Sequence, residues 1–391
     1  MRYGGVPGLT PASLEDEENL VTALRHPDRI CEIGLTITGS LGNRLAAEMQ
    51  TTMSSLETLT LMVQDRVELL LPDEFLGGSA PLLTVIGLYG VAFPALPKLL
   101  VWTSNLVSLE LWNIPRSGYF SPEALVIGLS ATTQLKSFTI HFEFSTSHFH
   151  TSNLRTPPLG RTVLPALTNL KFCGVNEYLE DIVARIDTPV LEIIDLRFFN
   201  RPLFEIPHLS HFVRRTSQLG SPTRAKIHSS GGAVSLALIH QTGTARAITI
   251  PGQLRLQITC RQFDWQLSAL SQISSQLSPF LSGVGQLDVR SFPTLASGHD
   301  DLDSARWSEV LRPFGGVERL RVFDELLLDI ARALQQASME PGPELFPTLC
   351  ELFVMGNSQE FSAVLEAISP FLSVRQLSGR PIAVYNWDAS S

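Results

Sequence analysis

Histidines are the residues of this 391-residue sequence best suited to chemistry, and three of them fall in one polar stretch, residues 141–162. His141, His148 and His150 could together hold a zinc ion through their ring nitrogens. Zinc sites usually add cysteine or carboxylate ligands at fixed spacing, and no set with that spacing accompanies these histidines in the sequence. We therefore expect an exposed loop over residues 141–162 and no metal site.

His208 and His211 form a second pair, spaced to share one face of a helix. Leu209, Phe212 and Val213 in the same segment indicate that this helix packs on a core. Surface histidines beside a packed helix face are the simpler interpretation.

Two further stretches have residue types that can bind ions. The acids of "HDDLD", residues 299–303, are too closely clustered for a calcium loop, which spreads its ligands over about twelve residues. We expect a solvated turn or a helix N-terminus there. The glycine-rich "YGGVPG" follows no strand and precedes no Lys-Ser/Thr pair, so a turn or tail is favoured over a phosphate loop.

The common catalytic signatures are missing from the sequence. It has no Gly-x-Ser-x-Gly, no Walker-type loop and no Gly-x-Gly-x-x-Gly motif. We therefore expect no enzyme, no catalytic residue, no cofactor and no metal. A divergent hydrolase near the histidine stretch stays open as the less favoured alternative.

Composition restricts the class of partner and the compartment. With 44% hydrophobic and 17% charged residues the chain can bury a large core, and a net charge of −9 argues against nucleic acid as the main partner. The apolar segment 82–102 contains Pro94, Pro97 and Lys98, so we expect no membrane span. The absence of a secretory signal and of glycosylation sequons, with four widely spaced cysteines expected to be buried free thiols, favours a cytoplasmic or nuclear protein.

The elements that must position any site are visible as a repeat. The pattern Leu-x-x-apolar-x-apolar occurs ten times, mostly at intervals close to the leucine-rich-repeat range of about 20–29 residues. Such triplets are frequent by chance in an apolar chain, so the stronger evidence is the helix pattern that precedes several of them. The ten starts are Ile30, Leu56, Leu83, Leu106, Leu135, Leu167, Leu191, Val284, Val317 and Leu349.

One helix-turn-strand unit shows this order clearly. Ser121-Pro122-Glu123 has the N-cap, first-turn proline and early acid of a helix start, and the strand beginning near Leu135 follows. Trp307, Val310, Leu311 and Phe314 give the helix spacing again, with Gly315 at the expected C-cap before the next strand. Each such unit has too little apolar surface to fold alone, so we expect neighbours to stack side by side.

The predicted fold class is α/β: an irregular leucine-rich-repeat-like solenoid with a parallel sheet on the concave side and helices on the convex side. We expect repeat units over residues 1–199, irregular middle units with a strand hairpin over 200–283, and further repeat units over 284–391, all in one continuous solenoid. The hairpin is predicted from "AKIHSSGGAVSLALIH".

Strand positions between the buried residues should project onto the concave face. As a candidate recognition surface they form an aromatic N-terminal patch and a basic C-terminal patch, the latter suited to an acidic or phosphorylated partner. The predicted partner-binding residues are Tyr89, Glu110, Trp112, His141, Lys171, Asp195, Arg197, Asp288, Arg290, Arg319, Arg321 and Phe323, with Thr139 beside them.

Several stretches resemble a known family. They are "YGGVPGLTPASLEDEENLVTALRHPDRICEIGLT", "SGYFSPEAL", "LPALTNLKFCGVNEYLEDIVARIDTPVLE", "CRQFDWQLSAL" and "LSGRPIAV". Together they resemble fungal (basidiomycete) F-box proteins with leucine-rich-repeat-like C-terminal regions. The resemblance implies the substrate-recognition region of an F-box-type ubiquitin-ligase receptor.

The F-box module itself, with its Leu-Pro-x-Glu-type start, is missing from this sequence. A Skp-type adaptor is therefore expected as a partner only if an F-box lies upstream. The prediction is a protein-interaction module with a protein partner of unknown identity, and the alternative is a structural scaffold with no ligase role.

Overall fold

The computed structural model describes residues 2–3, 14–143, 160–199, 204–230, 232–240, 253–259, 263–291, 302–323, 326–339, 344–355 and 358–386. The chain divides into two compact units, unit 1 (Met1–Leu191) and unit 2 (Glu192–Ser391). The predicted boundaries after residues 199 and 283, and the continuity of the solenoid, stay predictions.

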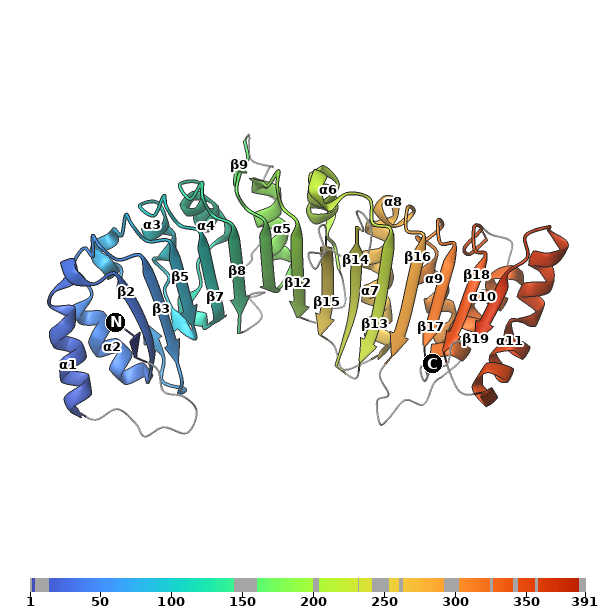
Figure 1. The fold of residues 1–391 in the computed structure, drawn as a ribbon, viewed down its shortest axis with the longest axis horizontal. Helices are drawn as coiled ribbons and strands as arrows, with labels where there is room; N and C mark the ends of the chain where they lie inside the picture. Colours follow the sequence, from blue (N-terminus) through green and yellow to red (C-terminus); the bar gives the residue numbers. More distant parts are fainter. Residues whose placement is uncertain are drawn as a thin grey trace. The chain divides into compact units, whose positions relative to one another are not determined.

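Unit 1 contains a sheet of parallel strands in the order β1-β2-β3-β5-β7-β8-β10 (Figure 1). Each strand except β1 alternates buried and less buried side chains along most of its length, as expected for a sheet with one covered face. The strands are β1 (Arg2–Tyr3), β2 (Glu32–Ile37), β3 (Thr58–Val63), β5 (Val85–Tyr89), β7 (Ser108–Ile114), β8 (Ser137–Phe142) and β10 (Asn169–Gly174).

The register of these strands aligns their buried residues into rows that run across the sheet. Each row buries side chains of successive repeats against one another, so no single repeat has a core of its own. One such row contains Ile33, Leu59, Ile86, Leu109, Phe138 and Leu170, all at most 1% exposed.

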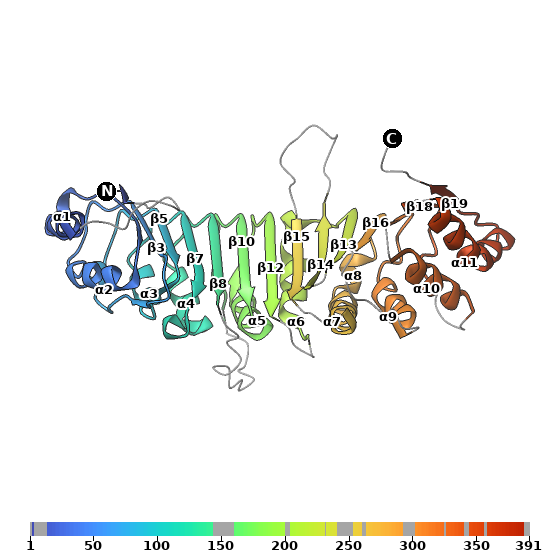
Figure 2. The same ribbon diagram turned by 90° about the horizontal axis from the view of Figure 1, so that it is seen from below.

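The helices of unit 1 that follow its strands cover one face of the sheet (Figure 2). The opposite face, without helices, is called the open face below. Two of these helices begin at the capping residues that their sequences supply: Thr38 accepts a hydrogen bond from Leu41 N, and Ser121 accepts one from Ala124 N at 3.1 Å. The helices are α1 (Leu14–Leu24), α2 (Gly39–Glu48), α3 (Leu96–Leu100), α4 (Pro122–Leu129) and α5 (Asn176–Arg185).

Two short strand pairs complete unit 1. Strands β4 (Leu69–Leu70) and β6 (Val91–Ala92) pair in parallel, as do β9 (Thr162–Val163) and β11 (Ile186–Asp187). Each pair links neighbouring repeats outside the main sheet.

Unit 2 contains strands in the order β12-β15-β14-β13-β16-β17-β18-β19, and all neighbours are parallel except those of β14 (Figure 1). They are β12 (Ile193–Phe199), β13 (Arg224–Ser230), β14 (Ala233–Ile239), β15 (Gln253–Thr259), β16 (Gln286–Ser291), β17 (Arg319–Phe323), β18 (Glu351–Met355) and β19 (Ala383–Asn386).

The strands β13, β14 and β15 form an antiparallel meander inside this sheet. Strand β13 pairs with β16, the chain turns back through β14, and β15 pairs with β12. The predicted hairpin is confirmed, since β13 and β14 pair from Arg224 with Ile239 to Ser230 with Ala233. The meander therefore reverses the spatial order of three strands without breaking the sheet.

The helices of unit 2 lie along one face of its sheet (Figure 2). They are α6 (Pro207–Arg215), α7 (Phe263–Gln276), α8 (Ser278–Leu281), α9 (Leu302–Leu311), α10 (Leu327–Met339) and α11 (Ser358–Leu377). Ser229 on β13 donates to Gln266 Oε1 on α7, so the odd-numbered side chains of β13 face the helices.

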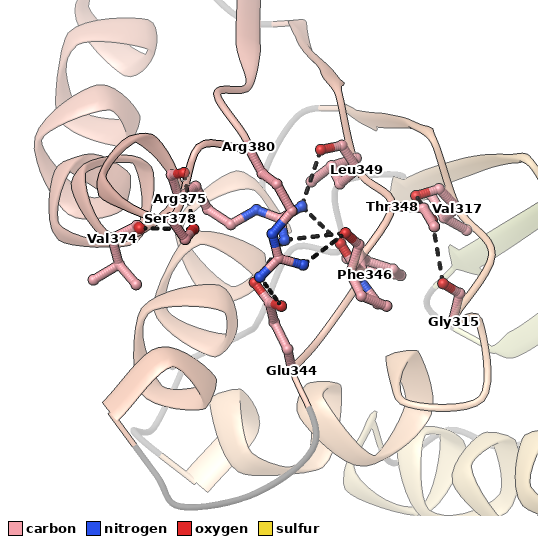
Figure 3. A network of polar contacts seen from close by, with 11 residues as sticks. Gly315, Val317, Glu344, Phe346, Thr348, Leu349, Val374, Arg375, Ser378 and Arg380 are labelled. Carbon is pink, nitrogen blue, oxygen red and sulfur yellow. Dashed lines mark hydrogen bonds and ion pairs between the residues drawn. The ribbon is translucent and has the colours of Figure 1, made fainter.

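The last helix of unit 2 is fixed by one buried arginine (Figure 3). Arg375 is 1% exposed, and its guanidinium donates to Glu344 Oε1 at 2.6 Å and to the carbonyls of Phe346, Pro347 and Leu349. Arg380 pairs with the other oxygen of Glu344 at 2.9 Å. The end of α11 is thus bound to the segment that leads into β18.

Each of the ten matches to the leucine-repeat pattern leads into a strand. At each of them a strand begins two residues after the first apolar residue, as β2 at Glu32 follows Ile30 and β18 at Glu351 follows Leu349. Mixed α/β structure with a mostly parallel sheet and helices on one face is the predicted fold class, and each unit has it. Within the described residues, no helix has the length and apolarity that crossing a bilayer requires.

Several local predictions are wrong. His141 and Phe142 belong to β8 and Thr162 to β9, so the stretch 141–162 is strand at both ends, and residues 144–159 lie outside the described residues. Gly315 is not a C-cap of the left-handed kind, because α9 ends at Leu311 and the φ of Gly315 is not positive. Cys31 and Cys350 are free thiols but exposed rather than buried.

Candidate functional site

The predicted aromatic residues lie in one row on the open face of unit 1. Tyr89 on β5 stands opposite Trp112 on β7, and the rings of Trp112 and His141 meet edge to face at 5.6 Å. Lys171 on β10 is exposed and stands opposite Thr139 on β8. We call Tyr89, Trp112 and His141 the aromatic row.

A bulge in β7 determines the position of Trp112 in the aromatic row. The pairing of β7 with β8 shifts between Leu111 and Ile114, and Asn113 has a φ of 54°. Asparagine tolerates this left-handed conformation better than most residues. The extra residue lets Trp112 stay on the open face beside His141 while Ile114 returns to the core.

Tyr89 and Glu110 form a polar pair beside this row. The hydroxyl of Tyr89 donates to Glu110 Oε2 at 2.7 Å. Partial burial and then this carboxylate raise the pKa of Tyr89 to about 12, because both disfavour the negatively charged phenolate. Tyr89 therefore stays neutral and holds its ring in place.

The predicted charged residues of unit 2 project from the open face of its sheet. Asp195 and Arg197 lie on β12 with their charged atoms 3.9 Å apart, and Arg319 on β17 donates to Glu351 Oε2 on β18 at 2.7 Å. Arg321 lies over the ring of Phe353 at 5.2 Å. Arg290 on β16 lies one strand away from Arg319 and Arg321, because β16 pairs with β17.

Three predicted surface residues are buried instead. Asp288 is 0% exposed because Arg224 and Gln286 bind its two carboxylate oxygens. Phe323 is 3% exposed because the guanidinium of Arg290 lies over its ring, 3.9 Å from the centroid. Thr139 is likewise 3% exposed between its neighbouring strands.

The meander adds cations that the sequence prediction missed. Lys226 on β13 and Arg255 on β15 stand on either side of Ala237 on β14, and both are exposed. Period-two alternation in "RAKIHSS" and "LRLQIT" is the signal that could have found them, since it assigns these residues to one face. The partner-binding residues were predicted from the leucine repeat, and this repeat is interrupted between Leu196 and Val284.

Seven cationic side chains therefore occupy the open face of unit 2, against three carboxylates at the described strand positions of that face. This face is positive although the whole chain carries −9. We call the set the basic face: Arg197, Arg224, Lys226, Arg255, Arg290, Arg319 and Arg321.

The cations of the basic face differ in their partners. Arg224 binds Asp288, and Arg319 binds Glu351. Within the described part of the chain, Lys226, Arg255 and Arg290 form no ion pair with a carboxylate. Arg255 lies on β15, Lys226 on β13 and Arg290 on β16, and β14 separates β15 from β13.

Burial and neighbouring positive charge lower the pKa values of two groups on β13. Burial, then the neighbouring Arg224 and Arg290, lowers the pKa of Lys226, although Asp288 opposes the effect. Burial, then Arg255 and Arg290, lowers the pKa of His228 on β13. The clustered cations therefore repel one another, and an anion placed among them would relieve that repulsion.

The described residues include only some of the histidines considered in the sequence prediction. His141 is part of the aromatic row, His148 and His150 lie outside the described residues, and His208 and His211 are exposed on α6 beside buried Leu209. The described residues contain no group of three or more His, Cys, Asp or Glu side chains arranged to hold a metal ion. Asp303 of the "HDDLD" stretch lies in α9, and residues 299–301 are not described.

Comparison with known proteins finds similarity among solved structures. No family model and no curated protein matches the chain. The chain is similar to the crystal structure of the leucine-rich-repeat-containing protein LegL7 from Legionella pneumophila, with 13% identity over 86% of this chain and 98% of that one. The TM-score of 0.31 is too low to support any argument.

The fold class consequently rests on the topology of the two units. Both units have stacked αβ repeats, a mostly parallel sheet and one face free of helices, which define an irregular leucine-rich-repeat-like α/β architecture. On this architecture the open face is the surface that strand residues of several repeats share.

Proposed function

We propose that this chain is a protein-interaction module and that the basic face of unit 2 binds an acidic segment of a partner protein. The observation that carries the proposal is the set of Lys226, Arg255 and Arg290, three neighbouring cations that form no ion pair with the described carboxylates. An acidic segment laid across the strands would meet all three.

The placement of these side chains on strands supports binding. Strand residues are held by the ladders on both sides, so the cations are positioned before a partner arrives, and little order has to be gained on binding. Repulsion among them makes the unliganded face less stable than a neutral one, and a bound carboxylate offsets that cost.

A protein partner is favoured over nucleic acid by the distribution of charge. Asp195 and Glu351 interrupt the cations at both sides of the basic face, and the chain as a whole is acidic. A nucleic acid backbone needs an extended run of cations, because affinity grows with each phosphate that is neutralised. A short acidic segment fits the three cations Lys226, Arg255 and Arg290, which form no ion pair with the described carboxylates.

The finer role, substrate recognition for a ubiquitin ligase, is supported only by the resemblance to F-box proteins of fungi. In that role the basic face would contact the substrate. Co-purification of the chain, expressed with its own upstream sequence, with a Skp-type adaptor would support the ligase role. Failure to bind the adaptor would leave the interaction module without a ligase link.

The acidic-segment proposal is tested by titrating a fluorescent peptide rich in Asp and Glu. We expect the combined variant Lys226→Gln, Arg255→Gln, Arg290→Gln to weaken binding by about tenfold or more, since several charge-assisted contacts are lost. Higher salt should weaken the wild type more than the variant.

A matched control carries Arg25→Gln, Arg29→Gln and Arg312→Gln, which remove the same charge at exposed positions off the basic face. Its affinity should stay close to that of the wild type. Equal weakening of the two triple variants would mean that only net charge matters, and the basic face would not be the site.

A further inference from the structure

Strand β14 brings short side chains between two cationic strands of the basic face. Ala237 stands opposite Lys226 on one side and Arg255 on the other, and Ser235 stands opposite His228 and Gln257 in the same way. The residues of β13 and β15 are thus separated by two strand spacings, roughly 10 Å. Only a methyl group and a hydroxymethyl group rise between them.

A further cation stands next to this pair of strands, because Arg290 on β16 is opposite His228 on β13. Arg255 on β15 and Arg290 on β16 both act on the charge of His228, and Arg290 also acts on Lys226. The register places Lys226 and Arg255 on the two strands that flank β14, so their long side chains can reach one ligand above Ala237. Ser235 is 8% exposed, as expected for a floor residue beneath longer neighbours.

We infer that Lys226, Arg255, His228 and Ser235 form a subsite for a phosphorylated side chain, a phosphoserine or phosphothreonine in the acidic segment of the partner. The inference rests on the proposed function and specifies its ligand. The phosphoryl group lies above Ala237 and accepts hydrogen bonds from both strands.

The charge of the cluster favours a phosphoryl group over a carboxylate. A carboxylate carries one negative charge, whereas a phosphomonoester carries about −1.5 to −2 at neutral pH. Lys226 and Arg255 lie on the two strands that flank β14, and Arg290 is near them on β16. Their combined positive charge matches the larger negative charge of the phosphoryl group. The described carboxylates nearest to them, Asp288 and Asp195, are already near arginines.

The arrangement of the ligand oxygens also favours a phosphoryl group over a carboxylate. The oxygens of a carboxylate lie in one plane and suit one arginine, while the three terminal oxygens of a phosphoryl group point in three directions. One oxygen can reach Lys226 and another Arg255, with charge-assisted hydrogen bonds of about 2.8 Å on each side. Ser235 lies below them as a hydroxyl donor.

The test compares three peptides of one acidic sequence, with serine, glutamate or phosphoserine at the central position. We expect the wild-type chain to bind the phosphoserine peptide about tenfold more tightly than the glutamate peptide. The double variant Lys226→Gln, Arg255→Gln should bring that ratio close to one. The variant Arg197→Gln, Arg319→Gln removes the same charge outside the subsite and should keep the ratio.

Nuclear magnetic resonance of the imidazole protons gives an independent readout, with His228→Gln used to assign the signal. The phosphoserine peptide should raise the pKa of His228, because a dianion beside the ring favours the imidazolium form. The glutamate peptide should raise it much less.

Equal affinity of the wild type for the phosphoserine and glutamate peptides overturns the subsite and leaves the proposed function standing. Failure of all three peptides to bind overturns both. A short single-stranded RNA that displaces the phosphoserine peptide at equal concentration would assign the subsite to nucleic acid and also overturn the inference.

Discussion

The guanidinium of Arg290 lies over the ring of Phe323, with 3.9 Å between its central carbon and the ring centroid. The contact joins β16 to β17 and covers the aromatic ring, while the charge stays at the surface of the basic face. It fixes one of the three cations on which the proposed function depends.

Phe323 and Arg290 should therefore be energetically coupled. Phe323→Leu removes the ring, and we expect a loss of about 1–2 kcal/mol in the free energy of unfolding. In a double-mutant cycle with Arg290→Gln, urea unfolding should give a coupling of about 0.5 kcal/mol or more. Strict additivity of the two changes would mean that the stacking contributes nothing.

The buried Arg375 should be the most sensitive single polar position of unit 2. Arg375→Met leaves Glu344 Oε1 and the carbonyls of Phe346 and Leu349 without this donor. Breaking such a buried pair costs about 3–5 kcal/mol, and hydrogen exchange of α11 should quicken. Arg380→Gln removes a half-exposed partner of the same carboxylate and should cost less than about 1 kcal/mol. Similar losses for both variants would contradict this assignment.

Close stacking of neighbouring turns makes one of two adjacent glycines irreplaceable. A Cβ atom on Gly316 would lie 2.2 Å from the carbonyl oxygen of Ser282, whereas a Cβ on Gly315 would meet nothing within 4 Å. Thermal unfolding should show that Gly316→Ala lowers stability by about 2 kcal/mol or more, while Gly315→Ala stays within about 0.5 kcal/mol. Equal effects would show that the turns are not in this close contact.

The Tyr89–Glu110 pair makes an electrostatic prediction for unit 1. The pKa of Tyr89 is raised to about 12 by burial and by Glu110, so Glu110→Gln should lower it toward 10 without reaching it. The neutral phenol is favoured in the folded state, so its stabilising effect is complete below pH 10 and is lost as the pH rises toward 12. Ultraviolet absorbance of tyrosinate, with Tyr89→Phe as reference, measures the shift, and an unchanged titration in Glu110→Gln would contradict it.

The strands of the regular repeats could be predicted from the sequence because burial has a simple period. In Leu-x-x-apolar-x-apolar the last two apolar residues of each unit, such as Leu59 and Leu61, point to one side of a strand, and the first anchors the turn before it. The same parity assigned Trp112 and Arg321 to the open face. Whether these residues bind a partner stays a prediction.

The centre of the basic face could not be predicted in the same way. The hairpin was visible in the sequence, but its place between β12 and β16 depends on long-range pairing that no local pattern encodes. Arg224 and Asp288 are 64 residues apart in the chain, so the burial of Asp288 had no local signal. Phe323 has the parity of an open-face residue, and it is covered only because Arg290 folds over it.

Cross-linking tests the central claim most directly. An acidic peptide with a photoreactive group at its centre is irradiated with the full-length chain, and the modified residues are identified by mass spectrometry. The account predicts that modifications concentrate on the open-face residues of β13, β14, β15 and β16, and that unlabelled peptide competes them away. Modifications that fall mainly on the helices, or on the aromatic row of unit 1, would contradict it.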